Sequence, residues 1–307
     1  MATLSSVHVT VPATTANVGP GFDCLGAALT LYNRFRFSLL PAGSESLTIE
    51  ALGSDAAGVA TDSSNLAYRA FSEVYQHTGK SVPAVKIGIE LRVPLARGLG
   101  SSATAIIGGL IGANALLGSP LCPTEVMQLA IALEGHPDNV VPALLGGCQL
   151  TVASDQNQPI ICTIPWHDEI APILAVPDFE LSTSAARHVL PDHYSRADAI
   201  FNTAHLGLLI RGLETGHVEW LRAALCDRIH QPYRHTLIPG YEAVYEAALS
   251  AGAHGLVISG AGPTLLALAH SDQGPAVGMA IAQAWANYDI QAHIYHLKLD
   301  TQGVVVE

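Results

Sequence analysis

The sequence predicts a protein of the α+β class with two domains, and three observations support this prediction. Its 307 residues exceed what one ordinary domain needs and suffice for two domains of about 150 residues each. Segments with the alternating apolar pattern of strands are interspersed with segments of helical spacing in both halves of the chain. Finally, 49% of the residues are apolar and only 13% are charged, which argues against disorder, coiled coils and long solvated helices.

The elements of the first half follow from apolar periodicity, helix caps and turn residues. Alternating apolar residues predict strands at residues 7–11, 29–40, 47–52, 84–93 and 144–152. The small residues 13–21 predict a loop after the first of these strands. Helical spacing predicts helices at residues 65–76 and 103–117, and a third helix after Cys122 with Thr124 as its N-cap and Gly135 at its end.

The second half repeats the mixed pattern after a cluster of turn-forming residues at positions 154–159. We therefore expect a first domain over residues 1–160 and a second domain over residues 161–307. In the second domain, strands are expected at residues 173–176 and 256–258. Helices are expected at residues 199–213, 218–229 and 276–287.

The charge balance limits the classes of partner. With 14 Lys and Arg against 26 Asp and Glu, the net charge is −12, which argues against a surface that coats nucleic acid. An anionic ligand must therefore be held by a local device, such as a helix end, a glycine loop or a bound cation.

The sequence shows no sign of a membrane segment or an export signal. The longest nearly apolar stretch, residues 103–117, would span about 22 Å as a helix, short of the ~30 Å of a bilayer core. The N-terminal residues have neither a cationic region nor a long apolar run. Five scattered cysteines without a Cys-x-x-Cys pair are typical of reduced thiols. We therefore expect a cytoplasmic protein with no membrane contact.

A glycine loop at residues 98–102 lies between a predicted strand and a predicted helix. Glycines there let backbone N–H groups approach a phosphate, and the following helix N-terminus adds unpaired donors and a positive dipole end. The alternative is a tight connection with serine caps. Neither common nucleotide motif fits, because a Walker A loop ending at Gly79-Lys80-Ser81 would need glycine at Val74. A dinucleotide loop would need an acidic residue at a strand end, where this sequence has only Glu125 within a helix.

Three segments in order resemble the GHMP small-molecule kinases. Residues 94–103 read Pro-x-x-x-Gly-Leu-Gly-Ser-Ser-Ala, similar to the phosphate loop of that family. Residues 12–23 resemble its N-terminal block and residues 259–264 its C-terminal glycine block. The resemblance implies an N-terminal α+β nucleotide-binding domain, a C-terminal ferredoxin-like α/β sandwich and ATP as cofactor. It implies nucleotide contacts from Pro94, Leu95, Ala96, Arg97, Gly98, Leu99, Gly100, Ser101, Ser102, Ala103, Thr104, Gly260 and Gly262, with Asn65 and Leu66 as candidates near the adenine.

Four further segments are similar to the members of this family that phosphorylate the side-chain hydroxyl of L-homoserine. They are residues 17–23, 134–139, 182–187 and 230–234. The resemblance implies a phosphotransferase with an alcohol acceptor that forms O-phospho-L-homoserine for threonine biosynthesis. The acceptor-binding residues that it implies are Asn17, Asp23, His136, Asn139, Thr183, Arg187 and Arg234. Physically, the arginines suit the carboxylate, Asp23 suits the ammonium group, and the two asparagines suit a hydroxyl.

The resemblance assigns a Mg²⁺ ion to Ser102 and Glu134. Glu134 precedes the expected helix end at Gly135, where the negative dipole end disfavours a carboxylate and a bound cation would offset that cost. The alternative is an exposed glutamate. Helices of about 24 Å over residues 102–117 and about 15 Å over residues 125–134 leave Glu134 roughly 9 Å short of Ser102 in a strict hairpin. Helix tilt or the loop 118–124 must supply that difference.

The proton acceptor has two alternatives. Asn139, which the resemblance places at the hydroxyl, cannot accept a proton. Either Asp138 is the general base, or no protein base acts and the γ-phosphate takes the proton. The catalytic residues expected are therefore Ser102, Glu134, Asn139 and Asp138.

Two other functions compete with this interpretation. One is another kinase of the same family, of the mevalonate or diphosphocytidyl-methylerythritol type, whose acceptor carries no ammonium group. The other is a sensor that binds nucleotide without turnover, which the presence of Ser102 and Glu134 disfavours. The sequence leaves open whether the chain acts alone or as a homodimer.

Overall fold

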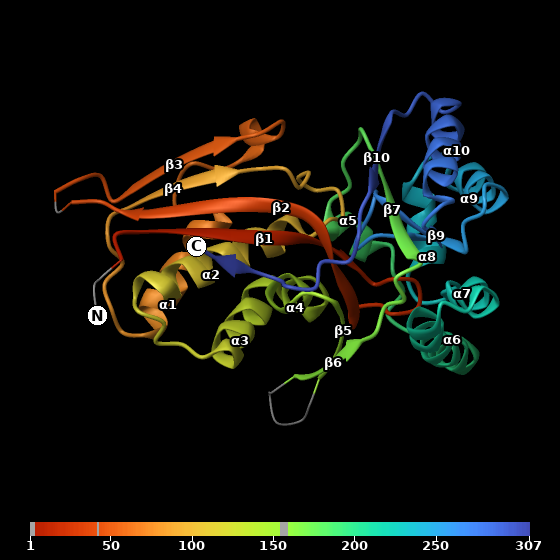
Figure 1. Ribbon diagram of the computed structural model, residues 1–307, viewed down its shortest axis with the longest axis horizontal. Coiled ribbons are helices and arrows are strands. Elements are labelled where there is room, and N and C mark those ends of the chain that lie inside the picture. The colour runs from red at the N-terminus through yellow and green to blue at the C-terminus, as the bar shows by residue number, and fades with distance from the viewer. Residues whose placement is uncertain (1–3, 42, 154–158) are drawn as a thin grey trace.

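Two β-sheets, one built mainly from each half of the chain, form the framework of the molecule (Figure 1). The computed structural model describes residues 4–41, 43–153 and 159–307. The first sheet contains β1 (Ser6–Ala16), β2 (Leu25–Leu39), β3 (Leu47–Leu52), β4 (Val85–Glu90), β5 (Cys148–Val152), β6 (Ile160–Ile164) and β11 (Val305–Val306). The second contains β7 (Ile170–Pro177), β8 (Gly255–Ile258), β9 (Leu265–His270) and β10 (Ala292–His296).

The first sheet has the order β11-β1-β2-β4-β3, and β5 pairs with the beginning of β2 and with β6. Only β3 and β4 run parallel among the strand pairs of the described residues. Buried and partly exposed residues alternate along β4, as expected for a sheet with one covered face. The register of β1 on β2 shifts between Pro12 and Ala13, so β1 continues beyond its proline to Ala16.

Four helices cover one face of this sheet: α1 (Leu66–His77), α2 (Ser101–Leu116), α3 (Pro123–Glu134) and α4 (Pro137–Leu145) (Figure 1). The rings of Phe37 on β2 and Phe71 on α1 stack with centroids 5.4 Å apart. Helix α2 lies close to the sheet because it presents glycines there. A Cβ on Gly108 would lie 2.6 Å from the Phe35 ring, and one on Gly112 would lie 2.4 Å from the Phe37 ring.

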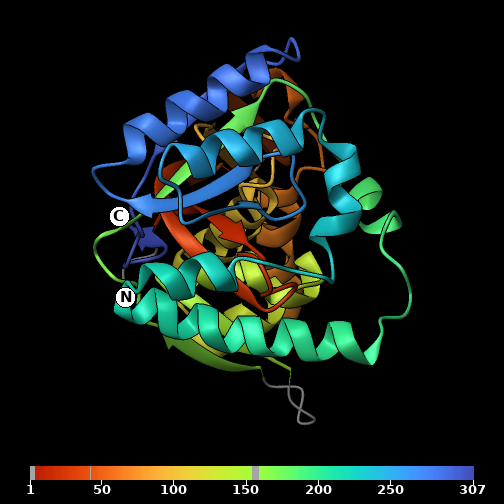
Figure 2. The ribbon, with the colours of Figure 1, turned by 90° about the vertical axis from the view of Figure 1, so that its right-hand side faces the viewer.

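The second sheet has the strand order β10-β7-β9-β8, and each neighbouring pair is antiparallel. Helices α9 (Tyr241–Ser250) and α10 (Gly274–Ala286) pack together on one face, as Figure 2 shows at the top. The chain order of strand, helix, strand, strand, helix, strand is that of a ferredoxin-like fold. The expected two-domain α+β architecture is therefore confirmed.

The opposite face of the second sheet belongs to a core that both halves share. Helices α6 (Arg196–Thr215) and α7 (Val218–Ala224) cover it from below in Figure 2. Leu25 and Leu29 of β2 are fully buried in the same cluster as Leu174 of β7 and Leu266 of β9. Short helical segments connect these layers: η1 (Ala56–Gly58), α5 (Thr183–His188), α8 (Gln231–Arg234) and η2 (His235–Leu237).

Several local expectations need correction. The expected loop at residues 13–21 begins only after Ala16, because β1 stays paired with β2 to that point. The N-cap of α3 is Cys122 rather than Thr124, since the Glu125 carboxylate accepts the Cys122 backbone N–H at 2.7 Å. The strand expected from residue 144 begins at Cys148, and the helix expected over residues 218–229 ends at Ala224. Helix α4, which is not among the elements predicted above, begins at Pro137 with His136 as its N-cap.

The division expected at residues 160/161 runs through β6, which pairs with β5 in the first sheet. It stays a prediction, and this pairing favours a division between β6 and β7. Most of the turn cluster on which the prediction rested, residues 154–158, lies outside the described residues. Among the helices of the described residues, none is both long enough and apolar enough to cross a membrane.

Candidate active site

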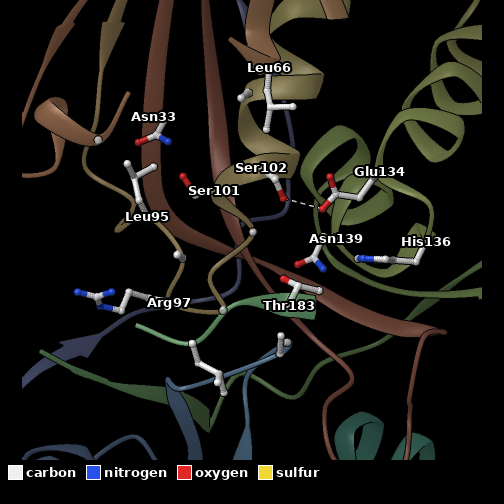
Figure 3. Close-up of a pocket in the computed structure, with 18 of the residues that line it drawn as sticks. Asn33, Leu66, Leu95, Arg97, Ser101, Ser102, Glu134, His136, Asn139 and Thr183 are labelled. Atoms are coloured by element: carbon white, nitrogen blue, oxygen red, sulfur yellow. Dashed lines mark hydrogen bonds between the residues drawn. The ribbon is translucent and has the colours of Figure 1, made fainter. Parts of the chain in front are cut away.

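A cavity of about 440 Å³ lies where the two halves of the chain meet (Figure 3). Its walls come from the middle of β2, the end of β4, the N-terminus of α2, the α3–α4 turn, helix α5 and the loop around Gly260. Twenty of the residues expected at the site line it: Asn17, Asp23, Asn65, Leu66, Leu95, Ala96, Arg97, Gly98, Gly100, Ser101, Ser102, Glu134, His136, Asp138, Asn139, Thr183, Arg187, Arg234, Gly260 and Gly262. The structure therefore brings together residues from almost the whole chain.

The glycine loop forms a cradle of backbone N–H groups in front of α2. Ala96, Gly98 and Gly100 have φ angles of 51°, 79° and 65°, so left-handed residues recur at every second position. Such alternation turns successive N–H groups toward one point and makes an anion-binding concavity. Gly100 is also the N-cap of α2 and supplies no side-chain acceptor, which leaves the first N–H groups of the helix available to an anion.

The C-terminal glycine block supports this loop from behind. The Ser259 hydroxyl donates to the Gly98 carbonyl at 2.7 Å, and the Gly260 N–H donates to the Ala16 carbonyl at 3.0 Å. A Cβ on Gly98 would lie 2.3 Å from the Ser259 carbonyl oxygen. Gly98 is therefore required because two loops approach closely, and not only because of its positive φ.

One end of the cavity is apolar and follows the first sheet. Phe35, Val59, Ile89 and Leu91 line it, next to Leu66 at the start of α1. Asn65 caps α1 by accepting the Ala67 and Tyr68 N–H groups, and its own amide donates to the Ala60 carbonyl at 2.7 Å. This end is an apolar chamber of the kind that accepts an aromatic ring.

Asn33 stands between that chamber and the glycine loop. Its side-chain oxygen accepts the backbone N–H groups of Arg92 and Val93, and its amide donates to the Thr104 hydroxyl at 2.9 Å. The Asn33 side chain thus fixes the chain leaving β4 against the first turn of α2. The sequence interpretation missed it, although a single asparagine within an apolar strand pattern was a visible signal.

Ser102 and Glu134 meet at the other side of the glycine loop. The Ser102 hydroxyl donates to Glu134 Oε1 at 2.6 Å, the contact drawn in Figure 3. Because α3 starts at Pro123, two residues before the expected start, it measures about 18 Å and closes part of the expected shortfall. Burial raises the pKa of the Glu134 carboxyl above its ordinary value, although the Ser102 hydrogen bond opposes that shift.

The turn into α4 presents three polar side chains to the cavity. His136 Nδ1 and Asp138 Oδ1 are 2.7 Å apart, and this hydrogen bond raises the pKa of His136. The Thr14 hydroxyl donates to Asn139 Oδ1 at 2.8 Å, which leaves the NH₂ group of Asn139 to face a ligand. Figure 3 shows Asn139 and His136 beside Glu134, with Thr183 of α5 opposite.

Asp23 and Arg187 form an ion pair across the mouth of this end. Arg187 Nη2 lies 2.7 Å from Asp23 Oδ1, and Nη1 lies 3.0 Å from Oδ2, so the pair is bidentate. Both side chains are partly exposed. Asp23, which suits an ammonium group, and Arg187, which suits a carboxylate, therefore lie side by side. An α-amino acid carries these two charged groups on one carbon atom.

Arg234 lies behind this pair and is almost completely buried, with 1% of its surface exposed. Its Nε donates to the Ala186 carbonyl at 3.0 Å and its Nη1 to the Gly260 carbonyl at 3.1 Å. Burial lowers the pKa of Arg234 to about 10, so the side chain stays charged at neutral pH. A buried cation held by neutral carbonyls leaves its charge available to an anionic ligand.

Asn17 lines the cavity, as expected, and its side chain also makes two hydrogen bonds within the protein. Its amide donates to the Gly260 carbonyl at 2.7 Å, and its side-chain oxygen accepts the Asp23 N–H at 2.9 Å. Asn17 thus shapes the loop that carries Asp23 and joins it to the C-terminal glycine block.

Arg97 points away from Ser102 and Glu134 (Figure 3) and forms an ion pair with Glu180 at 3.2 Å.

Four residues expected at the nucleotide do not line the cavity: Pro94, Leu99, Ala103 and Thr104. Leu99 and Ala103 are core residues, and Thr104 binds Asn33. The side chains of Leu99, Ala103 and Thr104 therefore pack inside the protein behind the loop. The sequence of a motif does not reveal which of its side chains point into the protein, because their direction depends on the elements packed behind the motif.

Comparisons with known proteins identify the family. The GHMP kinases N terminal domain matches residues 65–147 and the GHMP kinases C terminal domain matches residues 209–287, together more than half of the chain. A homoserine kinase of Microchaete diplosiphon is 62% identical over 303 residues, 99% of this chain and 98% of that protein. A homoserine kinase of Thermosynechococcus vestitus is 60% identical over 97% of this chain and 98% of that protein.

Solved structures agree. The homoserine kinase of Cytophaga hutchinsonii superposes with a TM-score of 0.89 at 28% identity and covers 100% of this chain and 99% of its own. A mevalonate kinase of L. major in complex with R-mevalonate, 17% identical with a TM-score of 0.73 over 95% of both chains, shares the fold. The chain therefore belongs to the GHMP kinase family and, within it, to the homoserine kinases.

Proposed function

We propose that this chain transfers the γ-phosphoryl group of ATP to the side-chain hydroxyl of L-homoserine, with Mg²⁺ as cofactor. One observation supports the choice of acceptor above all. The cavity that contains the phosphate cradle also contains the Asp23–Arg187 ion pair, with Arg234 behind it. These side chains match the two charges of an amino acid, and a mevalonate-type acceptor has no ammonium group for Asp23.

The nucleotide lies along the cavity in this proposal. The adenine occupies the apolar chamber near Phe35, Val59 and Leu66, and the phosphates meet the N–H groups of the loop at Gly98 and Gly100. The α2 helix end faces the phosphates, so the charge that develops during transfer is stabilised by dipoles already in place.

The side chains of Ser102 and Glu134 suit Mg²⁺. Both offer oxygen, and the Glu134 carboxylate is buried with a raised pKa, which an adjacent cation would reverse. The described residues contain no group of three or more His, Cys, Asp or Glu side chains able to hold a metal. One carboxylate and one hydroxyl leave the remaining positions to phosphate oxygens and water, as Mg²⁺ prefers. When bound there, the ion neutralises charge on the transferred phosphoryl group.

The acceptor hydroxyl is oriented by Asn139 in this proposal. Thr14 binds the side-chain oxygen of Asn139, so the amide NH₂ is the group that faces the hydroxyl oxygen, and it cannot accept a proton. One carboxylate oxygen of Asp138, Oδ1, is engaged in the hydrogen bond with His136. We therefore favour direct attack of the hydroxyl, whose proton passes to the transferred phosphate group without a protein base.

The proposal places the chain in threonine biosynthesis in the cytoplasm, with ATP and homoserine as its small-molecule ligands. It also assigns Thr183 and His136 to the walls of the acceptor end, where both line the cavity.

A substrate screen with ATP and Mg²⁺ tests this function. Homoserine, other hydroxylated amino acids and mevalonate are offered to the wild type, and phosphorylated product is measured. We expect turnover with homoserine far above the rest. Preferred use of mevalonate, or ATP binding without turnover of any acceptor, would overturn the proposal.

The Arg187→Ala variant sharpens the test of the acceptor site. Loss of a charge-assisted bond worth about 1.5–3 kcal/mol raises KM for homoserine roughly 10- to 150-fold and leaves that for ATP nearly unchanged. A homoserine ester lacks the carboxylate charge and is expected to lose less than the acid. Arg211→Ala, which removes an exposed arginine paired with Glu214 on α6, is the matched control. Equal losses for acid and ester would place the carboxylate elsewhere.

A further inference from the structure

His230 lies directly behind the acceptor end, although it does not line the cavity. Its side chain is completely buried. The His230 ring stacks on the Phe22 ring with centroids 5.1 Å apart. The guanidinium carbon of Arg234 lies 5.2 Å from the centroid of the same Phe22 ring. Phe22, His230 and Arg234 therefore form one packed unit between the Asp23 loop and α8.

The two ring nitrogens of His230 have opposite partners. Nε2 lies 2.9 Å from the Gly19 carbonyl oxygen, which can only accept, so Nε2 must carry a hydrogen. Nδ1 lies 3.3 Å from Arg234 Nη1, which can only donate, so Nδ1 must offer a lone pair. Both neighbours therefore select the neutral ring protonated at Nε2, and a second proton would place an N–H against the guanidinium.

These two contacts connect the two charge-binding parts of the acceptor end. Gly19 belongs to the loop that Asn17 ties to Asp23, and Arg234 is the buried cation behind Arg187. The guanidinium of Arg234 is also held by the Ala186 carbonyl at Nε and by the Gly260 carbonyl at Nη1. The histidine thus supplies the third acceptor that sets the plane of the guanidinium.

The charged groups around His230 do not favour a protonated ring. Asp227 Oδ2 is 3.8 Å from Nε2, but this carboxylate already accepts from Asn202 and from the backbone N–H groups of residues 229–231. Arg234 and the nearby His235 oppose a positive charge, whereas Asp23 and Asp227 favour it. Burial is the largest effect, and it holds the pKa of His230 below its ordinary value of 6.5.

We propose that neutral His230 is a positioning residue that orients Arg234 toward the carboxylate of the amino-acid acceptor. The inference rests on the proposed function, since it takes the acceptor to be an amino acid. It predicts that apparent affinity for the acceptor decreases at acid pH, because the imidazolium loses its lone pair and repels Arg234.

Two isosteric replacements separate the contacts. In His230→Asn the amide oxygen takes the place of Nδ1 and accepts from Arg234, but the side chain cannot reach Gly19. In His230→Gln the amide nitrogen takes the place of Nε2 and donates to Gly19, but nothing stands at the Nδ1 position. His254→Gln is the matched control, because His254 is also buried in the second half and lies outside the cavity lining.

We expect His230→Gln to raise KM for homoserine about tenfold, with kcat and KM for ATP changed less than about threefold. His230→Asn should stay within about threefold of the wild type and should lose the rise in KM that the wild type shows at acid pH. His254→Gln should behave as the wild type does. Equal KM values for the two His230 variants, or an unchanged acid rise in the Asn variant, would overturn the proposal.

A measurement without substrate separates this inference from the proposed function. The ¹⁵N chemical shifts of the His230 ring report its tautomer in the full-length protein, with His230→Asn identifying the signal. A neutral ring protonated at Nε2 near pH 7 is expected. A ring protonated at Nδ1, or charged at that pH, would overturn the inference even if homoserine is phosphorylated. Failure of the wild type to use homoserine would instead contradict the proposed function.

Discussion

At the scale of single residues, the candidate site is built from side chains whose ordinary preferences conflict with their positions. Glu134 is buried at the negative end of α3, and this burial raises the pKa of its carboxyl. Arg234 is a cation without a carboxylate partner among its hydrogen-bond acceptors in the described residues. Buried charges without an opposite charge reduce stability, and proteins retain them where a bound ligand supplies the opposite charge.

Replacing Glu134 by Gln is expected to lower turnover by orders of magnitude and to leave the fold intact. The amide keeps the acceptor for the Ser102 hydroxyl but loses the charge that would hold Mg²⁺. Steady-state kinetics over a range of Mg²⁺ concentrations measure this effect. Glu125→Gln, at the exposed start of the same helix, is the control and should keep its turnover. Turnover of the Glu134 variant within twofold of the wild type would remove Glu134 from the metal site.

Replacing Asp138 by Asn tests the general base. The variant keeps a polar contact to His136 and loses the ability to accept a proton. If the phosphate group takes the proton, kcat should fall less than about tenfold, through the weakened contact alone. A thousandfold decrease in kcat at unchanged homoserine KM would establish Asp138 as the base.

At the scale of elements, the phosphate cradle depends on two loops from opposite ends of the chain. The loop before α2 provides the left-handed residues, and the block at residues 259–262 packs against its back. A Cβ on Gly100 would lie 1.9 Å from the Thr14 hydroxyl, so the space that a side chain would need at this position is occupied by protein. The glycines therefore set how closely strands, loops and helix approach one another.

Comparison of Gly98→Ala with Gly118→Ala separates backbone strain from close approach. Their φ angles are 79° and 81°, so the cost of a left-handed alanine, about 1–2 kcal/mol, is the same for both. A Cβ at residue 118 meets nothing within 4 Å, whereas one at residue 98 meets the Ser259 carbonyl. We expect Gly98→Ala to unfold at lower urea concentration than Gly118→Ala and to lose ATP affinity, which Gly118→Ala should keep. Equal ATP affinity in both variants would show that the loop contact does not shape the nucleotide site.

At the scale of the whole molecule, the two sheets are not independent. Leu29 of β2 and Leu266 of β9 belong to one buried cluster, and backbone hydrogen bonds such as that from Gly260 to Ala16 cross the same boundary. The cavity lies over this boundary, so its geometry depends on both halves. The short strand β11 returns to β1 and adds a further connection between the C-terminus and the first sheet.

We therefore expect a single cooperative thermal transition. Leu29→Ala and Leu266→Ala should each lower the free energy of unfolding by about 2–5 kcal/mol and shift the same transition. Leu52→Ala, at an exposed leucine, should leave it in place. Differential scanning calorimetry measures the number and the temperature of the unfolding transitions. The halves would be shown to unfold independently if two transitions were seen and each variant shifted only one of them.

The sequence by itself determined the local features of this protein. Strand β3 was predicted at its observed bounds, and helix α1 within one residue of its observed bounds, because the apolar periodicity that indicates them acts over a few residues. The glycine loop and its helix also follow from local sequence, and the resemblance of ordered segments pointed to the family. Helix α4 was missed because Pro137 and Pro142 obscure its pattern.

Only the tertiary structure decided which functional groups face one another. Asp23 and Arg187 are 164 positions apart, Thr14 and Asn139 are 125 apart, and His230 meets Gly19 across 211. No local pattern encodes such pairs. They depend on the packing of two sheets over a shared core, where shifts of an ångström make or break a hydrogen bond. The residue types of the site were therefore readable from the sequence, whereas their hydrogen-bond partners, including those of Asn17 and His230, came from the fold.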